Sequence, residues 1–312
     1  MIEVKNLGKR YGDKVAVDDL SFTVRPGIVT GFLGPNGAGK STTMRMIVGL
    51  DAPTSGSVTV NGRRYADHAA PLHEIGALLE AKAVHTGRSA YHHLLALAAT
   101  TGISRRRVNE VIDLVGLREV ARKRAGGFSL GMGQRLGIAS ALLGDPQTVL
   151  LDEPVNGLDP EGVRWIRNLL KGLAAEGRTV FISSHLMSEM ALTAEHLVVV
   201  GRGRLIADVP MDGFCGLASA TSVRVRSPQS HQLSELLAGP GVTISSGERG
   251  VLEVCGLSTE QIGDRAASAG LTLHELSLQQ ASLEEAFMEL THDSVEYSAT
   301  TPKQPVLAGK AA

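Results

Sequence analysis

A glycine-rich octapeptide near the N-terminus has the residue types and spacing of a phosphate-binding loop. It matches the pattern G-x-x-x-x-G-K-[ST], follows the apolar run 28–33 and opens a helix-like stretch that continues to Leu50. Glycines let successive backbone N–H groups surround an anion, and the N-terminus of a helix adds partial positive charge. The pattern predicts a nucleotide phosphate site made of Gly34, Pro35, Asn36, Gly37, Ala38, Gly39, Lys40 and Ser41, with Thr42 beside it.

Two side chains of this loop carry the expected chemistry. Lys40 can reach the β- and γ-phosphates of a bound nucleotide, and the hydroxyl of Ser41 can ligate Mg²⁺. A glycine-rich turn that only resembles such a loop is the alternative. The loop by itself therefore indicates nucleotide binding without identifying the kind of protein.

A pair of adjacent carboxylates supplies the second half of the predicted site. Asp152 and Glu153 follow the apolar run 148–151, which is typical of a buried strand. Side chains alternate along a strand, so the two carboxylates point in different directions. One of them is expected to hold Mg²⁺, through water, and the other to polarise an attacking water. A solvated acidic turn is the alternative interpretation.

Between and around these motifs, residues 1–215 resemble the ATP-binding subunit of an ABC transporter. Residues 128–136 stand where that family has its signature L-S-G-G-Q and the helix that follows. Residues 156–160 look like the family's D-loop, His185 occupies the switch-histidine position, and Tyr11 matches the aromatic residue that stacks on adenine. The motifs occur in the family's order at workable spacing.

The resemblance implies a mechanism in which two cassettes, identical or paralogous, close head-to-tail over two ATP molecules. Ser129 and Gly131 would contact the γ-phosphate of the ATP held by the opposite chain, and Asp159 would belong to the D-loop at that interface. Tyr11 would stack on adenine. Asp152 would help to organise Mg²⁺, Glu153 would orient the attacking water, and His185 would act catalytically as a sensor of the γ-phosphate.

The sequence departs from the family's pattern at two motifs. In the signature, Leu130 replaces the first glycine and Met132 the final glutamine, which puts the contact with the opposite chain's ATP in doubt. In the Q-loop, Glu80 stands where most members carry glutamine, and its carboxylate is expected to be a further Mg²⁺ ligand. With residues 282–287, this change resembles the bacitracin- and daunorubicin-type export ATPases.

Composition and charge agree with an α/β protein and restrict its partners. Charged residues make up 20% and the net charge is −1, so no overall field favours nucleic acid. The longest apolar runs fall short of the ~18 residues that span a bilayer. The resemblance then implies a separate integral membrane subunit, with this chain bound peripherally at the cytoplasmic face of the cell membrane.

Two other function classes compete with the transporter ATPase. A soluble ABC-type ATPase could act as a mechanochemical or regulatory module without a membrane, remodelling ribosomes or DNA. Such ABC proteins have two cassettes in one chain or long coiled coils, and this sequence shows neither. A small-molecule P-loop kinase would leave the signature and the D-loop without a role.

The order of predicted elements indicates a P-loop fold with a RecA-like α/β core. Residues 2–33 alternate as an antiparallel β-subdomain, to which 58–60 add a strand, and about 87–143 form an inserted helical subdomain. Within that insert, Ser104 is the expected cap of a helix that Gly116 ends. Asp159 and Pro160 are expected to begin a later helix of the core.

A second, small α+β domain is predicted for residues 216–291. Strand and helix patterns in the order βαββαβ, the last strand at 271–273, fit a ferredoxin-like fold, followed by a helix near 283–290 and a disordered tail at 292–312. The domain could dock or regulate, or only stabilise. His85, His92 and His93 lack the usual spacing of metal ligands, so a surface role near a membrane partner is favoured.

Overall fold

A six-stranded sheet with five parallel strands forms the centre of the N-terminal part. The computed structural model describes residues 1–80, 84–214, 222–246, 248–279 and 283–291. The strand order is β5-β6-β7-β3-β8-β9, in which only β9 is antiparallel to its neighbour. The strands are β3 (Val29–Leu33), β5 (Ile75–Leu78), β6 (Thr148–Leu151), β7 (Thr179–Ser184), β8 (His196–Gly201) and β9 (Arg204–Pro210).

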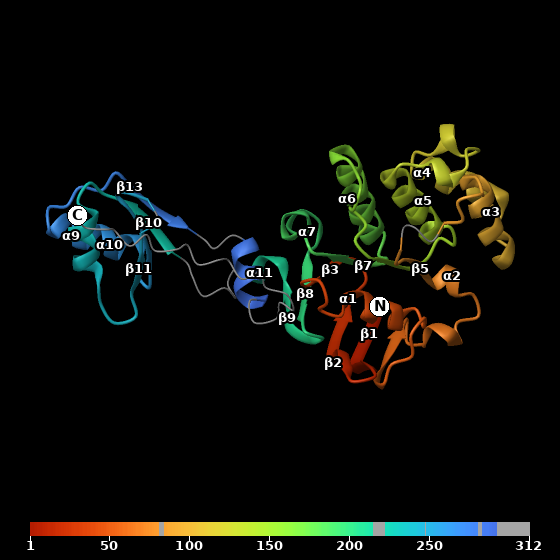
Figure 1. Cartoon of the computed structure of the whole chain (residues 1–312), viewed down its shortest axis with the longest axis horizontal. Coiled ribbons are helices and arrows are strands. Elements are labelled where there is room, and N and C mark those ends of the chain that lie inside the picture. Colours follow the sequence, from red (N-terminus) through yellow and green to blue (C-terminus); the bar gives the residue numbers. More distant parts are fainter. Residues whose placement is uncertain (81–83, 215–221, 247, 280–282, 292–312) are drawn as a thin grey trace, which may run out of the picture.

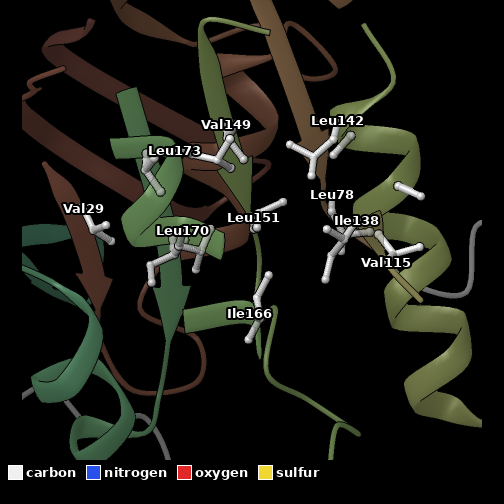
Figure 2. Close-up of a cluster of buried hydrophobic side chains, with 14 of the residues drawn as sticks. Val29, Leu78, Val115, Ile138, Leu142, Val149, Leu151, Ile166, Leu170 and Leu173 are labelled. Atoms are coloured by element: carbon white, nitrogen blue, oxygen red, sulfur yellow. The ribbon is translucent and has the colours of Figure 1, made fainter. Parts of the chain in front are cut away.

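Both faces of this sheet are buried, so every residue of its central strands β3, β6 and β7 is buried and most of these residues are apolar. On one face, Val149, Leu151 and Val180 join a core with helices α5 (Leu130–Leu142) and α6 (Pro160–Ala175). Figure 2 shows Val149 and Leu151 of β6 among the side chains of this core. Residues one position away along the strands, such as Leu150, point into a second core. Side chains point to opposite faces at successive positions of a strand, so a strand that is buried on both faces cannot shift by one residue without exchanging its two sets of core contacts.

The second core lies between the parallel sheet and an antiparallel sheet of order β2-β1-β4. That sheet comprises β1 (Ile2–Tyr11), β2 (Lys14–Val24) and β4 (Ser55–Val60), and helix α1 (Lys40–Ile47) packs beside it (Figure 1). The rings of Phe22, Phe32 and Phe181 join the layers, with centroids 5.1–5.7 Å apart. The expectation of one antiparallel unit over 2–33 was wrong for 29–33, because β3 pairs in parallel with β7 and β8.

The expected helical insert is present beyond β5, and its helix α4 begins at the predicted cap, Ser104. The Ser104 hydroxyl accepts a hydrogen bond from the N–H of Arg107 at 3.3 Å, and Gly116 ends the segment with φ +71°. Further helices in the N-terminal part are α2 (Pro71–Glu74), α3 (Ala90–Thr101), α4 (Arg105–Leu114), α7 (Met187–Thr193) and α8 (Met211–Phe214), with 3₁₀ helices η1 (Tyr65–Asp67), η2 (Arg118–Val120) and η3 (Ala125–Gly127).

The predicted βαββαβ order is observed after residue 221. The elements are β10 (Ser222–Arg226), α9 (Ser230–Leu237), β11 (Thr243–Ser245), β12 (Val251–Cys255), α10 (Thr259–Ser268) and β13 (Glu275–Gln279), in one sheet of order β11-β12-β10-β13. The last strand was placed wrongly at 271–273. Leu271 and Leu273 instead pack against the small core, and pairing begins where the His274 N–H bonds the Arg226 carbonyl.

The last described helix, α11 (Leu283–Thr291), returns to the N-terminal part. It packs on α7, and Phe287 and Leu290 lie against the core that covers the parallel sheet (Figure 1). The sequence analysis assigned this helix to the small C-terminal domain, but the helix contacts the N-terminal part of the chain. The expected tail from 292 lies outside the described residues. The domain boundaries themselves stay a prediction.

A pair of glycine substitutions tests this packing. A Cβ on Gly76 of β5 would lie 1.8 Å from the Ala141 carbonyl oxygen of α5, whereas one on Gly172 of α6 meets nothing within 4 Å. We expect Gly76→Ala to destabilise the protein by about 1–3 kcal/mol or more, through overpacking. The control Gly172→Ala lies on an exposed helical surface and should stabilise it by about 0.5–1 kcal/mol. Urea unfolding measures both, and a neutral Gly76→Ala would contradict the β5–α5 contact.

Candidate functional site

The phosphate loop joins the carboxyl end of β3 to the first turn of α1. Gly37 and Gly39 have φ values of +84° and +97°, which L side chains rarely adopt. A Cβ on Gly39 would also lie 2.5 Å from the carbonyl oxygen of Ala16. The glycines are therefore needed both for the turn and for the close approach of β2.

Lys40, the first residue of α1, is buried with 6% of its surface exposed. Its ammonium donates hydrogen bonds to the carbonyls of Gly34 at 2.6 Å and Pro35 at 3.3 Å. Burial lowers the pKa of Lys40, and the neighbouring carboxylates of Glu153 and Asp152 act in the opposite direction. The loop thus holds a cation within reach of two acids.

Asp152 directly follows β6 and meets the loop across the sheet. Its Oδ2 accepts a hydrogen bond from the Ser41 hydroxyl at 2.7 Å, and its Oδ1 accepts one from the hydroxyl of Ser183 at the end of β7. A hydroxyl and a carboxylate at this separation are the hard oxygen donors that Mg²⁺ prefers. The donor set therefore fits the predicted magnesium site.

Glu153 lines the same cavity as Asp152 but has a different side-chain partner. Its Oε2 lies 2.9 Å from Nδ1 of His185, and its backbone N–H donates to the Ser183 hydroxyl at 2.9 Å. Both side chains keep access to solvent, with 21% of Glu153 and 42% of His185 exposed. The structure thus pairs the two predicted catalytic residues, whose roles stay predictions.

The loop and the acid pair line one cavity of about 370 Å³. Tyr11 stands at its rim, half exposed, with its hydroxyl donating to Asp51 at 2.9 Å and the Lys9 ammonium 4.9 Å from the ring centroid. The cavity brings together the predicted residues Tyr11, Pro35, Asn36, Gly37, Ala38, Gly39, Lys40, Ser41, Thr42, Asp152 and Glu153. It is large enough for a nucleotide's phosphates.

The signature and D-loop residues lie outside this cavity. The Ser129 hydroxyl caps α5 by accepting from the Met132 N–H at 3.2 Å, with Gly131 in the same first turn. Asp159 caps α6 in the same way, accepting from Gly162 at 2.9 Å. The side chains thus have local structural roles within the chain. Their contact with the nucleotide of another chain stays a prediction.

Glu80 is not brought to Ser41 and Asp152. It follows β5 and lines a second cavity of about 470 Å³, together with Arg45, Leu72, Leu79 and His93. Its expected place among the metal ligands is therefore not supported by the side-chain positions. Among the residues that the structure describes, no group of three or more His, Cys, Asp or Glu could hold a metal ion.

The three histidines do not form a cluster of ligands either. His92 bonds the Ser89 hydroxyl at 2.8 Å, and His85 accepts from the Gly87 N–H at 3.1 Å. Burial lowers the pKa of His93, which lines the second cavity, and the charges of Arg88 and His85 act in the same direction.

Two polar residues of the site were missed by the sequence analysis. Ser183 bonds both the Asp152 carboxylate and the Glu153 backbone, and Gln134 of α5 donates from Nε2 to the Glu153 carbonyl at 3.2 Å. The position of Ser183 at the carboxyl end of a strand, two residues before His185, could have revealed it. Gln134 carries no such signal, because its partner is a backbone atom on another element.

Comparison with known proteins identifies relatives that cover up to 95% of this chain among those described here. A family model described as ABC transporter matches residues 17–156, and a domain of unknown function matches residues 221–284. The uncharacterized ABC transporter ATP-binding protein YhcH of Bacillus subtilis is 37% identical over 306 residues, covering 95% of this chain and 97% of that protein. The bacitracin transport ATP-binding protein BcrA of Bacillus licheniformis is 42% identical, covering 68% and 70%.

Solved structures agree with this relationship. A dimeric post-hydrolysis structure of the ATP-binding cassette MJ0796, bound to ADP and Pi, superposes with a TM-score of 0.62 at 25% identity. It covers 68% of this chain and 99% of the cassette. No helix within the described ranges is long and apolar enough to cross a membrane. Together with the phosphate loop and the paired carboxylates, these matches show that the chain belongs to the ABC transporter family, as an ATP-binding cassette ATPase.

Proposed function

We propose that this chain binds and hydrolyses ATP to drive transport through a membrane subunit encoded separately. The observation that carries the proposal is the convergence of Lys40, Ser41, Asp152, Glu153 and His185 at one edge of the sheet. The segments that follow β3 and β6 bring Lys40, Ser41, Asp152 and Glu153 to one cavity, and His185, which follows β7, contacts Glu153. Few other chemistries need a phosphate loop and two carboxylates side by side.

Binding of ATP is explained by charge neutralisation at the loop. Lys40 and the inward-facing N–H groups of residues 35–40 stabilise the phosphates, and the N-terminus of α1 adds partial positive charge. When the phosphates bind, Lys40 gives up its hydrogen bonds to the carbonyls of Gly34 and Pro35 and donates to the anionic phosphate oxygens instead. Hydrogen bonds to charged oxygens are stronger than those to carbonyls. Tyr11 at the cavity's rim stacks on adenine.

Ser41 and Asp152 hold Mg²⁺ in this proposal. When bound, the ion neutralises charge on the β- and γ-phosphate oxygens. Ser183 orients Asp152 through the hydroxyl that bonds its Oδ1, leaving Oδ2 directed toward Ser41. Because Glu80 lies in the other cavity, only Ser41 and Asp152 are proposed as protein ligands here.

Hydrolysis is assigned to Glu153 and His185. Glu153 accepts a proton from a water molecule as that water attacks the γ-phosphorus. The bond between the γ-phosphorus and the oxygen that bridges it to the β-phosphate breaks, and that oxygen leaves with ADP. His185, hydrogen-bonded to the base through Nδ1, keeps Nε2 for the γ-phosphate. The products are ADP and phosphate.

A second cassette completes each site. The MJ0796 structure is dimeric, and by analogy Ser129 and Gly131 of one chain meet the ATP bound to the loop of the other. The hydroxyl of Ser129 accepts a bond within its own helix and still has its proton to donate. The γ-phosphate then forms part of the interface, so ATP and ADP differ in affinity for the closed dimer.

The second cavity fits the expected contact with the membrane subunit. It lies where the strand β5, the α1 region and α5 meet, and it combines apolar walls with Arg45 and Glu80. A membrane partner that docks there places this chain at the cytoplasmic face of the membrane. The relatives named for bacitracin transport, lantibiotic transport and Nod factor export suggest export of a drug, antibiotic or lipid-like compound.

Replacement of Glu153 by glutamine tests the assignment of the base. The amide keeps the shape but accepts no proton, so we expect ATP hydrolysis to fall by about 10²–10⁴-fold while ATP binding is retained. The variant should accumulate as an ATP-bound dimer on size-exclusion chromatography. Phosphate release measures the rate, and the exposed Glu119→Gln is the matched control with unchanged turnover. Near-normal hydrolysis in Glu153→Gln would remove Glu153 from this role.

Replacement of Glu80 by glutamine separates a docking role from metal binding. Since Glu80 lines the second cavity, we expect the Mg²⁺ concentration for half-maximal ATPase activity to stay within about twofold of wild type. Stimulation of ATPase activity by the membrane subunit should decrease, and more so in Glu80→Ala. A clearly raised Mg²⁺ requirement in both variants would instead make Glu80 a metal ligand.

A further inference from the structure

The backbone of Glu153 has an unusual conformation. Its φ is +50°, in the left-handed region that residues other than glycine seldom occupy. Such a conformation costs about 1–3 kcal/mol and persists only where the surroundings impose it. The turn after β6 therefore needs tethers on both sides of Glu153.

Two side chains from other elements provide these tethers. The Ser183 hydroxyl, at the end of β7, accepts from the Glu153 N–H at 2.9 Å. The Gln134 amide, on α5, donates to the Glu153 carbonyl at 3.2 Å, and the Asn156 N–H donates to the same oxygen at 3.2 Å. The peptide groups before and after the base are thus both fixed.

Gln134 is buried, with 3% of its surface exposed. A buried amide must form hydrogen bonds to offset the loss of its contacts with water, and an apolar residue would pack here without that cost. The neighbouring Arg135 also bonds a backbone carbonyl, that of Val115 at 3.0 Å, but this bond ties α5 to the end of α4. Within the part of the chain that the structure describes, the bond from Gln134 is the side-chain hydrogen bond that leads from α5 to Glu153.

We propose that Gln134 is a positioning residue that holds Glu153 in its catalytic orientation and links it to the signature helix. The inference rests on the proposed function, because it takes Glu153 as the base. Gln134 follows the signature residue Ser129 by five positions, which is ~7.5 Å along a helix. A displacement of the N-terminus of α5, where the opposite chain's ATP is expected to bind, is therefore transmitted to the Glu153 carbonyl by a single rigid helix.

The test is Gln134→Met in the full chain, which keeps the length of the side chain and removes the donor. Because the Asn156 N–H still bonds the Glu153 carbonyl, that group is not left unpaired. We expect kcat for ATP hydrolysis to fall by about 10–100-fold, since small misplacements of a reacting group have effects of this size. KM and the affinity for ATP should stay within about twofold, because the phosphate loop is unchanged.

Arg135→Met is the matched control. It removes a side-chain hydrogen bond to a backbone carbonyl from the next position of the same helix, together with the contact between the guanidinium and the Trp165 ring, 4.4 Å away. Both variants should lose similar stability in urea unfolding, and only Gln134→Met should lose kcat. If Gln134→Met does not fold, Gln134→Leu, smaller and also without a donor, is measured in its place. Equal kcat in the Gln134 and Arg135 variants would overturn the proposal.

A double-mutant cycle with Glu153→Gln separates positioning from general damage. If Gln134 acts through the base, Gln134→Met should lower the residual rate of the Glu153→Gln protein by less than about twofold. An equal loss in both backgrounds would show a structural role and contradict the inference. If Glu153→Gln alone retains normal turnover, the assignment of the base fails first, whatever Gln134 does.

Discussion

The site depends on the electrostatic interaction between the buried ammonium of Lys40 and the anionic groups around it. Two carboxylates and the phosphates of a nucleotide cannot share one edge of a sheet without a fixed positive charge between them. The chain supplies it from the first residue of α1, where burial and the loop carbonyls hold the side chain in place. The strand order then matters: β7 alone separates β3 from β6, so loop, acids and Ser183 converge.

Rigidity of that edge comes from the double burial of the parallel sheet. Alternate residues of β3, β6 and β7 enter one core or the other, so a strand cannot slip without exposing both. The phenylalanine trio adds contacts between the parallel sheet and the antiparallel sheet that carries Tyr11. Helix α5 spans from the signature to β5, which joins the site to the second cavity.

Local patterns predicted much of this structure. The phosphate loop, the caps at Ser104 and Asp159, and the acid pair all depend on residues near one another in sequence, and each was found where expected. Features that depend on distant partners were not predicted from the sequence. Ser183 and Gln134 act on a turn reached from other elements, and α11 packs on α7. The strand expected at 271–273 lies further along the chain, at Glu275–Gln279, because its position is set by pairing with β10.

Calorimetric titration of ATP, with Mg²⁺, into the wild-type chain and Lys40→Met tests the central claim most directly. If Lys40 neutralises the phosphates, the variant should bind ATP at least about tenfold more weakly, the loss of a charged hydrogen bond. The control Lys171→Met, at an exposed position of α6, should bind as the wild type does. Equal affinity in all three folded proteins would contradict the account, because the nucleotide would then bind elsewhere.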